Sequence, residues 1–221
     1  MYSLLIKNGT VVTVDPLHRI YSPGFVAIQG DSVAAVGPME ALPDDVCAER
    51  VIDACDKVVM PGLVDGHGHA GHCMIKILGL NFGNWGEYAE DMYYHYVDDF
   101  FWYAEGALAA AERVKFGITT GVSMLGSTPR PDRIEFLESH FEGALKTGLR
   151  QISGIGACDG PWPKHPHVWE NGVARETTLV PETVVENTEY AVKHLNGRHK
   201  RQICIPMPGS LGQQTGMTDE E

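Results

Sequence analysis

Two histidines separated by one glycine, His67-Gly68-His69, are the residues best suited to chemistry in this sequence. They follow a short apolar stretch, Leu63-Val64, that is typical of a strand. Side chains alternate along a strand, so residues i and i+2 point to the same side with Cα atoms about 6.5–7 Å apart. Two imidazoles at that spacing can converge on one ion at about 2.0–2.1 Å. The motif therefore predicts a metal site at a strand end, although an isolated His-x-His pair binds nothing in most proteins.

Three more histidines lie near this chemistry or repeat its pattern. His72 follows His69 by three residues, where it could contact a substrate, support the metal ligands or be solvated. A second His-x-His motif, at residues 165–167, lies in a Pro- and Trp-rich segment, 157–178, which we expect to be a loop. Because proline disfavours strand pairing, we expect residues 165–167 to shape a pocket mouth and not to bind a metal.

Strands and helices alternate after Pro61-Gly62. A helix is predicted over about residues 100–115, where Ala104, Leu108, Ala111 and Val114 form an apolar repeat at three and four residues. Further strands are predicted at 118–124, 150–155 and 202–206, and further helices at about 133–147 and 181–195. This alternation indicates β-α units and a parallel sheet, as part of a barrel.

The first sixty residues have a different texture. Short runs rich in Val and Ile predict strands at 4–6, 11–14, 25–29, 33–36, 51–52 and 58–60. Gly30-Asp31 between two of these runs indicates a tight hairpin. We expect a small antiparallel β-unit here.

The sequence around the histidine pair resembles that of a known family. Residues 59–69, Val-Met-Pro-Gly-Leu-Val-Asp-Gly-His-Gly-His, are similar to the segment of the amidohydrolase superfamily that leads from a small β-domain into the first barrel strand. Residues 8–12 and 31–37 resemble that family's N-terminal strands. Residues 104–124 resemble its branch of nucleobase and nucleoside deaminases and triazine chlorohydrolases. The resemblance implies an α/β fold, with a small β-sandwich-like domain over 1–60 and about the first four β-α units of a (β/α)8 TIM-type barrel over 61–221.

The same resemblance implies a mechanism. This branch uses one divalent metal ion, here expected to be zinc with iron as the alternative, held by His67 and His69 and by a later His and Asp. The metal lowers the pKa of a water that attacks an sp² carbon. A later Glu, His and Asp move protons to the leaving group. These later residues are expected beyond Glu221, so no catalytic residue is assigned. About 160 residues follow the β-unit, whereas a barrel needs about 250, so we expect the N-terminal half of an enzyme.

The resemblance also indicates which residues face the substrate. Adenosine-type deaminases often carry an acidic residue before a Trp, where this sequence has Asn84-Trp85. An expected arginine is replaced near residues 154–155, and Met207 stands where a histidine would follow the fourth strand. These departures argue against adenosine-like nucleosides. Asn84, Trp85, Met207 and His72 are the candidate substrate-binding residues, although Trp85 could equally be a core residue.

Composition limits the partners. The net charge of −12 repels nucleic acid and anionic lipid. No apolar run reaches the roughly eighteen residues that a membrane helix needs. The five scattered cysteines predict no disulfide framework and favour a cytoplasmic protein. We expect a small-molecule substrate, and the resemblance allows a homodimer.

The leading interpretation is a metal-dependent hydrolase that acts on a C–N bond of a heterocyclic small molecule, by deamination or by amide or amidine hydrolysis; a C–Cl bond is a variant of the same chemistry. One alternative is an inactive fragment or pseudoenzyme that only binds a ligand or partner. Another is a two-metal cyclic amidohydrolase, but Lys115, Lys146 and Lys200 do not resemble that branch's bridging lysine.

Overall fold

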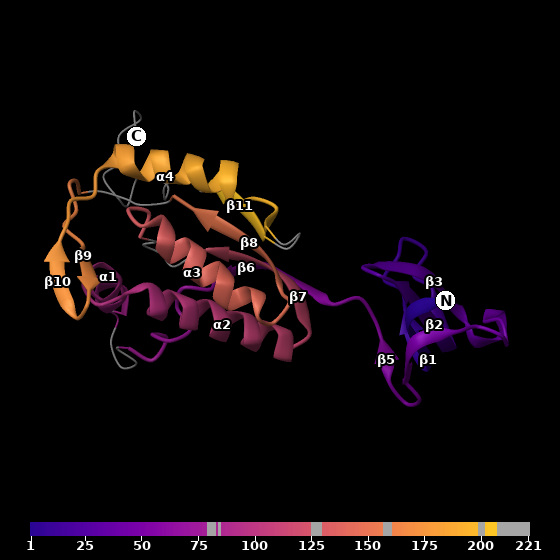
Figure 1. Cartoon of the computed structure of the whole chain (residues 1–221). Helices are drawn as coiled ribbons and strands as arrows, with labels where there is room; N and C mark the ends of the chain where they lie inside the picture. Colours follow the sequence, from indigo (N-terminus) through magenta and orange to yellow (C-terminus); the bar gives the residue numbers. More distant parts are fainter. Residues whose placement is uncertain (79–82, 84, 125–129, 157–160, 199–201, 207–221) are drawn as a thin grey trace. The chain divides into compact units, whose positions relative to one another are not determined.

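The computed structural model describes residues 1–78, 83, 85–124, 130–156, 161–198 and 202–206. The chain divides into two compact units, Met1–Gly62 and Leu63–Glu221 (Figure 1). Within the described ranges, no helix is long and apolar enough to cross a membrane.

The first unit is built on one mixed sheet. Its strands are β1 (Tyr2–Val12), β2 (Ile20–Gln29), β3 (Ser32–Pro38), β4 (Ala48–Asp53) and β5 (Val58–Val59), and the short 3-10 helix η1 spans Met39–Ala41. They lie in the order β3-β2-β1-β4, and β5 also pairs with β1. Leu5, Phe25 and Ala27 form its buried core.

This sheet differs from the sequence prediction in two ways. The predicted strands at 4–6 and 11–14 are one strand, β1, which continues through register shifts on either side of Gly9. The sheet is also not purely antiparallel. β1 pairs antiparallel with β2, and β2 with β3, as the hairpin at Gly30 predicts, whereas β4 and β5 run parallel to β1. Local turn signals reveal hairpins, but parallel pairing depends on a long crossover that leaves no local signal.

The second unit contains a four-stranded parallel sheet. Its strands are β6 (Leu63–His69), β7 (Ile118–Met124), β8 (Arg150–Ile155) and β11 (Gln202–Pro206), in the spatial order β11-β8-β7-β6. All three pairings are parallel. Strands therefore follow one another in space as they do along the chain, and the predicted strands at 118–124, 150–155 and 202–206 are confirmed at both ends.

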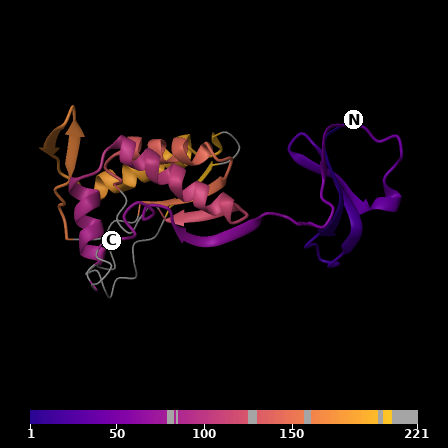
Figure 2. The ribbon, with the colours of Figure 1, turned by 90° about the horizontal axis from the view of Figure 1, so that it is seen from below.

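Four helices accompany this sheet, α1 (Trp85–His95), α2 (Asp99–Lys115), α3 (Ile134–Leu145) and α4 (Pro181–His194). Figures 1 and 2 show α2, α3 and α4 along one face of the sheet. Asp98 caps α2 by accepting a hydrogen bond from the Phe101 backbone N–H at 2.8 Å. A Cβ atom at Gly106 of α2 would overlap the His140 carbonyl of α3, so these two helices approach closely.

The buried face of α2 is not the apolar repeat seen in the sequence. Leu108 and Val114 are 38% and 40% exposed, whereas the buried residues of α2 include the charged Glu105 and Arg113. Both charges have polar partners inside the unit, as described below, and partnered charges can be buried. The helix was predicted correctly, and its orientation was not.

The segment 157–178 is not a simple loop. Strands β9 (His167–Glu170) and β10 (Val173–Glu176) form an antiparallel hairpin. The turn at Asn171-Gly172 has positive φ at both residues, which suits a tight hairpin turn. The proline at position 166 precedes the first strand residue, where it removes no ladder hydrogen bond.

Candidate metal-binding site

His67 and His69 project from the last residues of β6 and their imidazoles approach each other. The two Nε2 atoms are 3.2 Å apart, and the rings are nearly perpendicular at 78°. Both residues are exposed. Partial desolvation of the His69 ring, and secondarily the neighbouring His67, lowers the pKa of His69, which favours the neutral imidazole that a metal requires.

This separation fits one tetrahedral ion. Two nitrogens at about 2.05 Å from a common ion, at the tetrahedral angle, lie about 3.3 Å from each other. The observed 3.2 Å is close to that value. Within the described part of the chain, no group of three or more His, Cys, Asp or Glu side chains could hold a metal ion. The described residues thus offer two nitrogen donors, and a complete zinc site needs more.

His72 stacks on this pair and makes a specific hydrogen bond. Its ring is nearly parallel to that of His69, at 5.1 Å between centroids. Its Nδ1 lies 2.5 Å from the hydroxyl of Tyr93, and that hydroxyl donates to the Gly71 carbonyl. A phenol has one proton, so we assign Nδ1–H of His72 as the donor to Tyr93 and leave Nε2 as an acceptor. Burial, followed by the neighbouring His69, lowers the pKa of His72 to about 4, which keeps this ring neutral.

The loop after His69 is tied to the helices by buried polar groups. Glu105 of α2 accepts the backbone N–H groups of Cys73 and Met74, at 2.5 and 2.8 Å. His140 of α3 lies 3.1 Å from the Ala70 carbonyl through its Nε2 atom. Burial raises the pKa of Glu105 and lowers that of His140 to about 4. With Tyr93 of α1, which donates to the Gly71 carbonyl, side chains from three helices hold the loop that carries His72.

Trp85 has a structural contact as well as a place beside the site. Its ring meets His72 edge-on at 4.6 Å between centroids, and its Nε1–H donates to the Ile75 carbonyl at 3.2 Å. The hydrogen bond and its packing against a buried cluster fit the interpretation of Trp85 as a core residue, and its role in substrate binding stays a prediction. Asn84 and Met207, the other two candidates for substrate binding, lie outside the described residues.

Several residues around the site were missed in the sequence analysis, namely Arg113, Glu105, Tyr93 and His140. The buried stripe of α2 contains Trp102, Glu105, Ala109 and Arg113, at spacings of three and four. Glu105 and Arg113 thus fall on the same helical stripe as an aromatic and a small residue, and this spacing was the available signal that both charges are buried.

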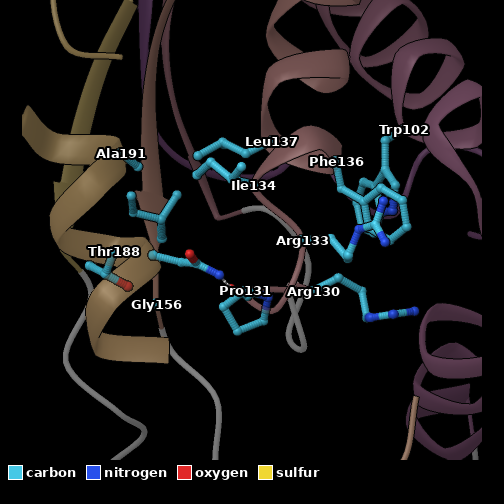
Figure 3. Close-up of a pocket in the computed structure, with 12 residues that line it drawn as sticks. Trp102, Arg130, Pro131, Arg133, Ile134, Phe136, Leu137, Gly156, Thr188 and Ala191 are labelled. Carbon is cyan, nitrogen blue, oxygen red and sulfur yellow. Dashed lines mark hydrogen bonds between the residues drawn. The ribbon is translucent and has the colours of Figure 1, made fainter. Parts of the chain in front are cut away.

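A separate cavity lies between α3 and α4 near the end of β8 (Figure 3). It is lined mainly by apolar groups, among them Phe136, Leu137, Ile155 and Ala191, with Arg130 and Arg133 at its side. Its volume is about 40 Å³. Pockets for heterocyclic ligands typically hold about 300–1,000 Å³, so this cavity is too small for such a substrate.

Comparison with known proteins supplies several relatives. The chain is 32% identical over 182 residues to a 5-methylthioadenosine/S-adenosylhomocysteine deaminase of Syntrophobacter fumaroxidans, covering 80% of this chain and 39% of that protein. It is 30% identical to a 5'-deoxyadenosine deaminase of Methanococcoides burtonii, covering 72% of this chain and 34% of that protein. The chain thus spans well under half the length of these relatives. No family model matches it.

Two solved structures share the fold. An atrazine chlorohydrolase from Arthrobacter aurescens, complexed with zinc, superposes with a TM-score of 0.69 at 20% identity, covering 92% of this chain and 46% of that chain. An adenosine deaminase from Xanthomonas campestris, with bound zinc, gives 0.68 at 17% identity, covering 93% and 42%. The mixed α/β architecture with its parallel sheet is therefore one that is known from these hydrolases.

Proposed function

We propose that this chain, which belongs to the amidohydrolase superfamily on the branch of single-metal deaminases and chlorohydrolases, supplies the first two metal ligands of a hydrolase active site. The ligands are His67 and His69. The observation that carries the proposal is the 3.2 Å separation of their Nε2 atoms at the end of β6. The atrazine chlorohydrolase and adenosine deaminase structures that share this fold contain zinc, so zinc is the ion to test first, with iron as the alternative.

Each described residue of the site would have its own role around the metal. When bound, the metal makes water a nucleophile at neutral pH. His67 and His69 hold it as neutral imidazoles. His72, with Nε2 free to accept a hydrogen bond, would receive an N–H group of the substrate, and Trp85 would pack beside it. Tyr93 keeps His72 in that tautomer. The general acid and base are not among these residues.

The substrate class is a heterocycle that carries an exocyclic amino group, and the reaction is hydrolysis of that C–N bond. Support comes from the relatives, whose names are those of deaminases for adenine-containing nucleosides. Asn84 and Met207 depart from the adenosine-type pattern, which argues against a ribose grip of that kind. An amino heterocycle agrees both with the relatives' substrates and with the departures at Asn84 and Met207. We therefore propose the amino heterocycle and leave out the ribose.

The parallel sheet would form part of a larger barrel. Its strands keep chain order in space and its helices lie along one face, which is the arrangement of consecutive units in a (β/α)8 barrel. A strand end that carries metal ligands then belongs to the active-site face.

We further propose that the first unit, about residues 1–60, is part of a β-sandwich-like domain. A cytoplasmic location, a small-molecule partner and a homodimer are part of the same proposal.

Ammonia release tests the proposed reaction. The intact, zinc-loaded protein is incubated with 5'-methylthioadenosine, adenine, an aminotriazine and a chlorotriazine, and ammonia and chloride are measured. We expect ammonia from at least one amino heterocycle, loss of that activity in His67→Ala, and its retention in His165→Ala. Zinc binding without turnover of any compound would favour the alternative of a protein that only binds its ligand. Chloride without ammonia would move the reaction to the C–Cl bond.

A further inference from the structure

We infer that Arg113 is a positioning residue that fixes the geometry of the His67–His69 pair by clamping a bulge in β6, an inference that rests on the proposed metal site. Arg113 lies in the last turn of α2 with its side chain 9% exposed. It extends from the helix to β6 and β7, the two strands that lie side by side at the edge of the sheet. No contact of Arg113 with substrate is part of the inference.

All three nitrogens of the guanidinium group donate to these strands, and one of them donates to both. Nε and one terminal nitrogen reach Oδ2 of Asp65, at 3.0 and 2.9 Å. The latter nitrogen also donates to the Val122 carbonyl at 3.0 Å, and the other terminal nitrogen donates to the Ser123 hydroxyl. Arg113 therefore bridges the metal-ligand strand and its neighbour.

The bridge spans an irregularity in the strand. Asp65 faces Gly121 across the ladder, but Gly68 faces Ser123, so three steps along β6 match two steps along β7. A bulge of this kind re-aims side chains and is common beside active sites. His67 lies inside this bulge. The partners of Arg113 are at both of its ends.

Asp65 transmits the contact to the first ligand. One carboxylate oxygen, Oδ2, is held by Arg113, and the other, Oδ1, accepts the backbone N–H of His67 at 3.2 Å. Arg113 is thus connected to the metal ligand His67 through one side chain, that of Asp65. Outer hydrogen bonds of this type orient metal ligands in proteins.

Two glycines make room for the guanidinium group. A Cβ atom at Gly68 would overlap a terminal nitrogen of Arg113 and lie 2.9 Å from Oδ2 of Asp65. A Cβ atom at Gly121 would lie 2.9 Å from Cζ of Arg113. A side chain at the middle position of the His-x-His motif would therefore displace the guanidinium group, which packs against the backbone between the two ligands. Lysine cannot replace this fork of donors, since its ammonium group is a single point of charge.

Zinc affinity tests the inference independently of turnover. We would measure it by competition with a chromophoric chelator in the intact wild-type protein and in Arg113→Met, Arg113→Lys and Gly68→Ala, with folding checked by circular dichroism. Arg130→Met is the matched control. Arg130 is also buried and paired with an aspartate, Asp132, but its other bonds go to the Tyr93 and Tyr94 carbonyls and not to β6.

We expect zinc affinity about 10- to 100-fold weaker in both Arg113 variants, the usual effect of losing an outer partner of a metal ligand. Gly68→Ala retains the guanidinium group of Arg113 but displaces it, so this variant should also bind zinc more weakly. It serves as the test if Arg113→Met does not fold. Arg130→Met should lower thermal stability and keep the wild-type affinity. Wild-type affinity in folded Arg113→Lys and Gly68→Ala, or an equal loss in Arg130→Met, would overturn the inference alone. Absence of zinc from the wild-type protein would overturn the proposed function and this inference together.

Discussion

The wild-type protein should lose stability between pH 7 and pH 5 because His140 is buried as a neutral ring. Replacing His140 by asparagine should abolish most of that loss. The His140 side chain is fully buried in α3. Its Nε2–H donates to the Ala70 carbonyl at 3.1 Å, and its Nδ1 accepts from the Gln151 side-chain amide at 3.2 Å. Those two bonds use both nitrogens of a neutral ring, so a second proton would have to displace the amide.

The sign and size follow from the pKa. Burial lowers the pKa of His140 from 6.5 to about 4 in the folded protein. Between those values the unfolded chain binds more protons, so the free energy of unfolding falls as the pH falls, and the loss is complete below about pH 4. The shift corresponds to about 3 kcal/mol in total, of which about 2 kcal/mol is lost between pH 7 and pH 5.

Urea unfolding at pH 7, 6 and 5 measures this directly. Asparagine keeps a polar amide but does not titrate, so His140→Asn should start less stable at pH 7 and then show a shallower pH dependence, by about 2 kcal/mol over the range. His69 and His72, whose pKa values are also lowered, titrate in both proteins and cancel in the comparison. Parallel pH curves for the two proteins would refute the assignment of a neutral, buried His140.

Two further substitutions test the way in which the site is held. Glu105→Ala leaves the Cys73 and Met74 N–H groups without their acceptor. We expect a loss of about 1–3 kcal/mol in urea unfolding, because two partly buried donors would be unpaired; a loss below about 0.5 kcal/mol would contradict the contact. Gly106→Ala forces a Cβ atom into the His140 carbonyl and should cost about 1–3 kcal/mol, whereas the same change at the open position Gly86 of α1 should not destabilise the protein.

Much of the second unit could be predicted from the sequence, and the reason is local. Gly117 and Gly148 have positive φ and end the helical segments before them. The apolar runs that follow these glycines predicted the positions of β7 and β8. The orientation of α2 could not be predicted, because its apolar repeat pointed away from the face that is buried. That face is stabilised by Glu105 and Arg113. Glu105 binds Cys73 and Met74, and Arg113 binds Asp65, residues that are 31 to 48 positions away in the chain.

The site shows the same division. The His-x-His motif indicated two converging imidazoles, because strand alternation is a local rule. The role of Arg113 was not predictable, since this residue meets Asp65 and Ser123 only after β6, β7 and α2 have packed. Likewise, the role of Tyr93 as the partner of His72 depends on where α1 lies.

The most direct test of the central claim is the zinc content and zinc affinity of the intact protein with each histidine replaced in turn. We expect one zinc per wild-type chain, loss of stoichiometric zinc in His67→Ala and in His69→Ala, and full retention in His165→Ala. The His165 side chain belongs to the second His-x-His motif and is 54% exposed. A wild-type protein that binds no zinc or iron, or His67→Ala and His69→Ala proteins that bind zinc as the wild type does, would contradict this expectation.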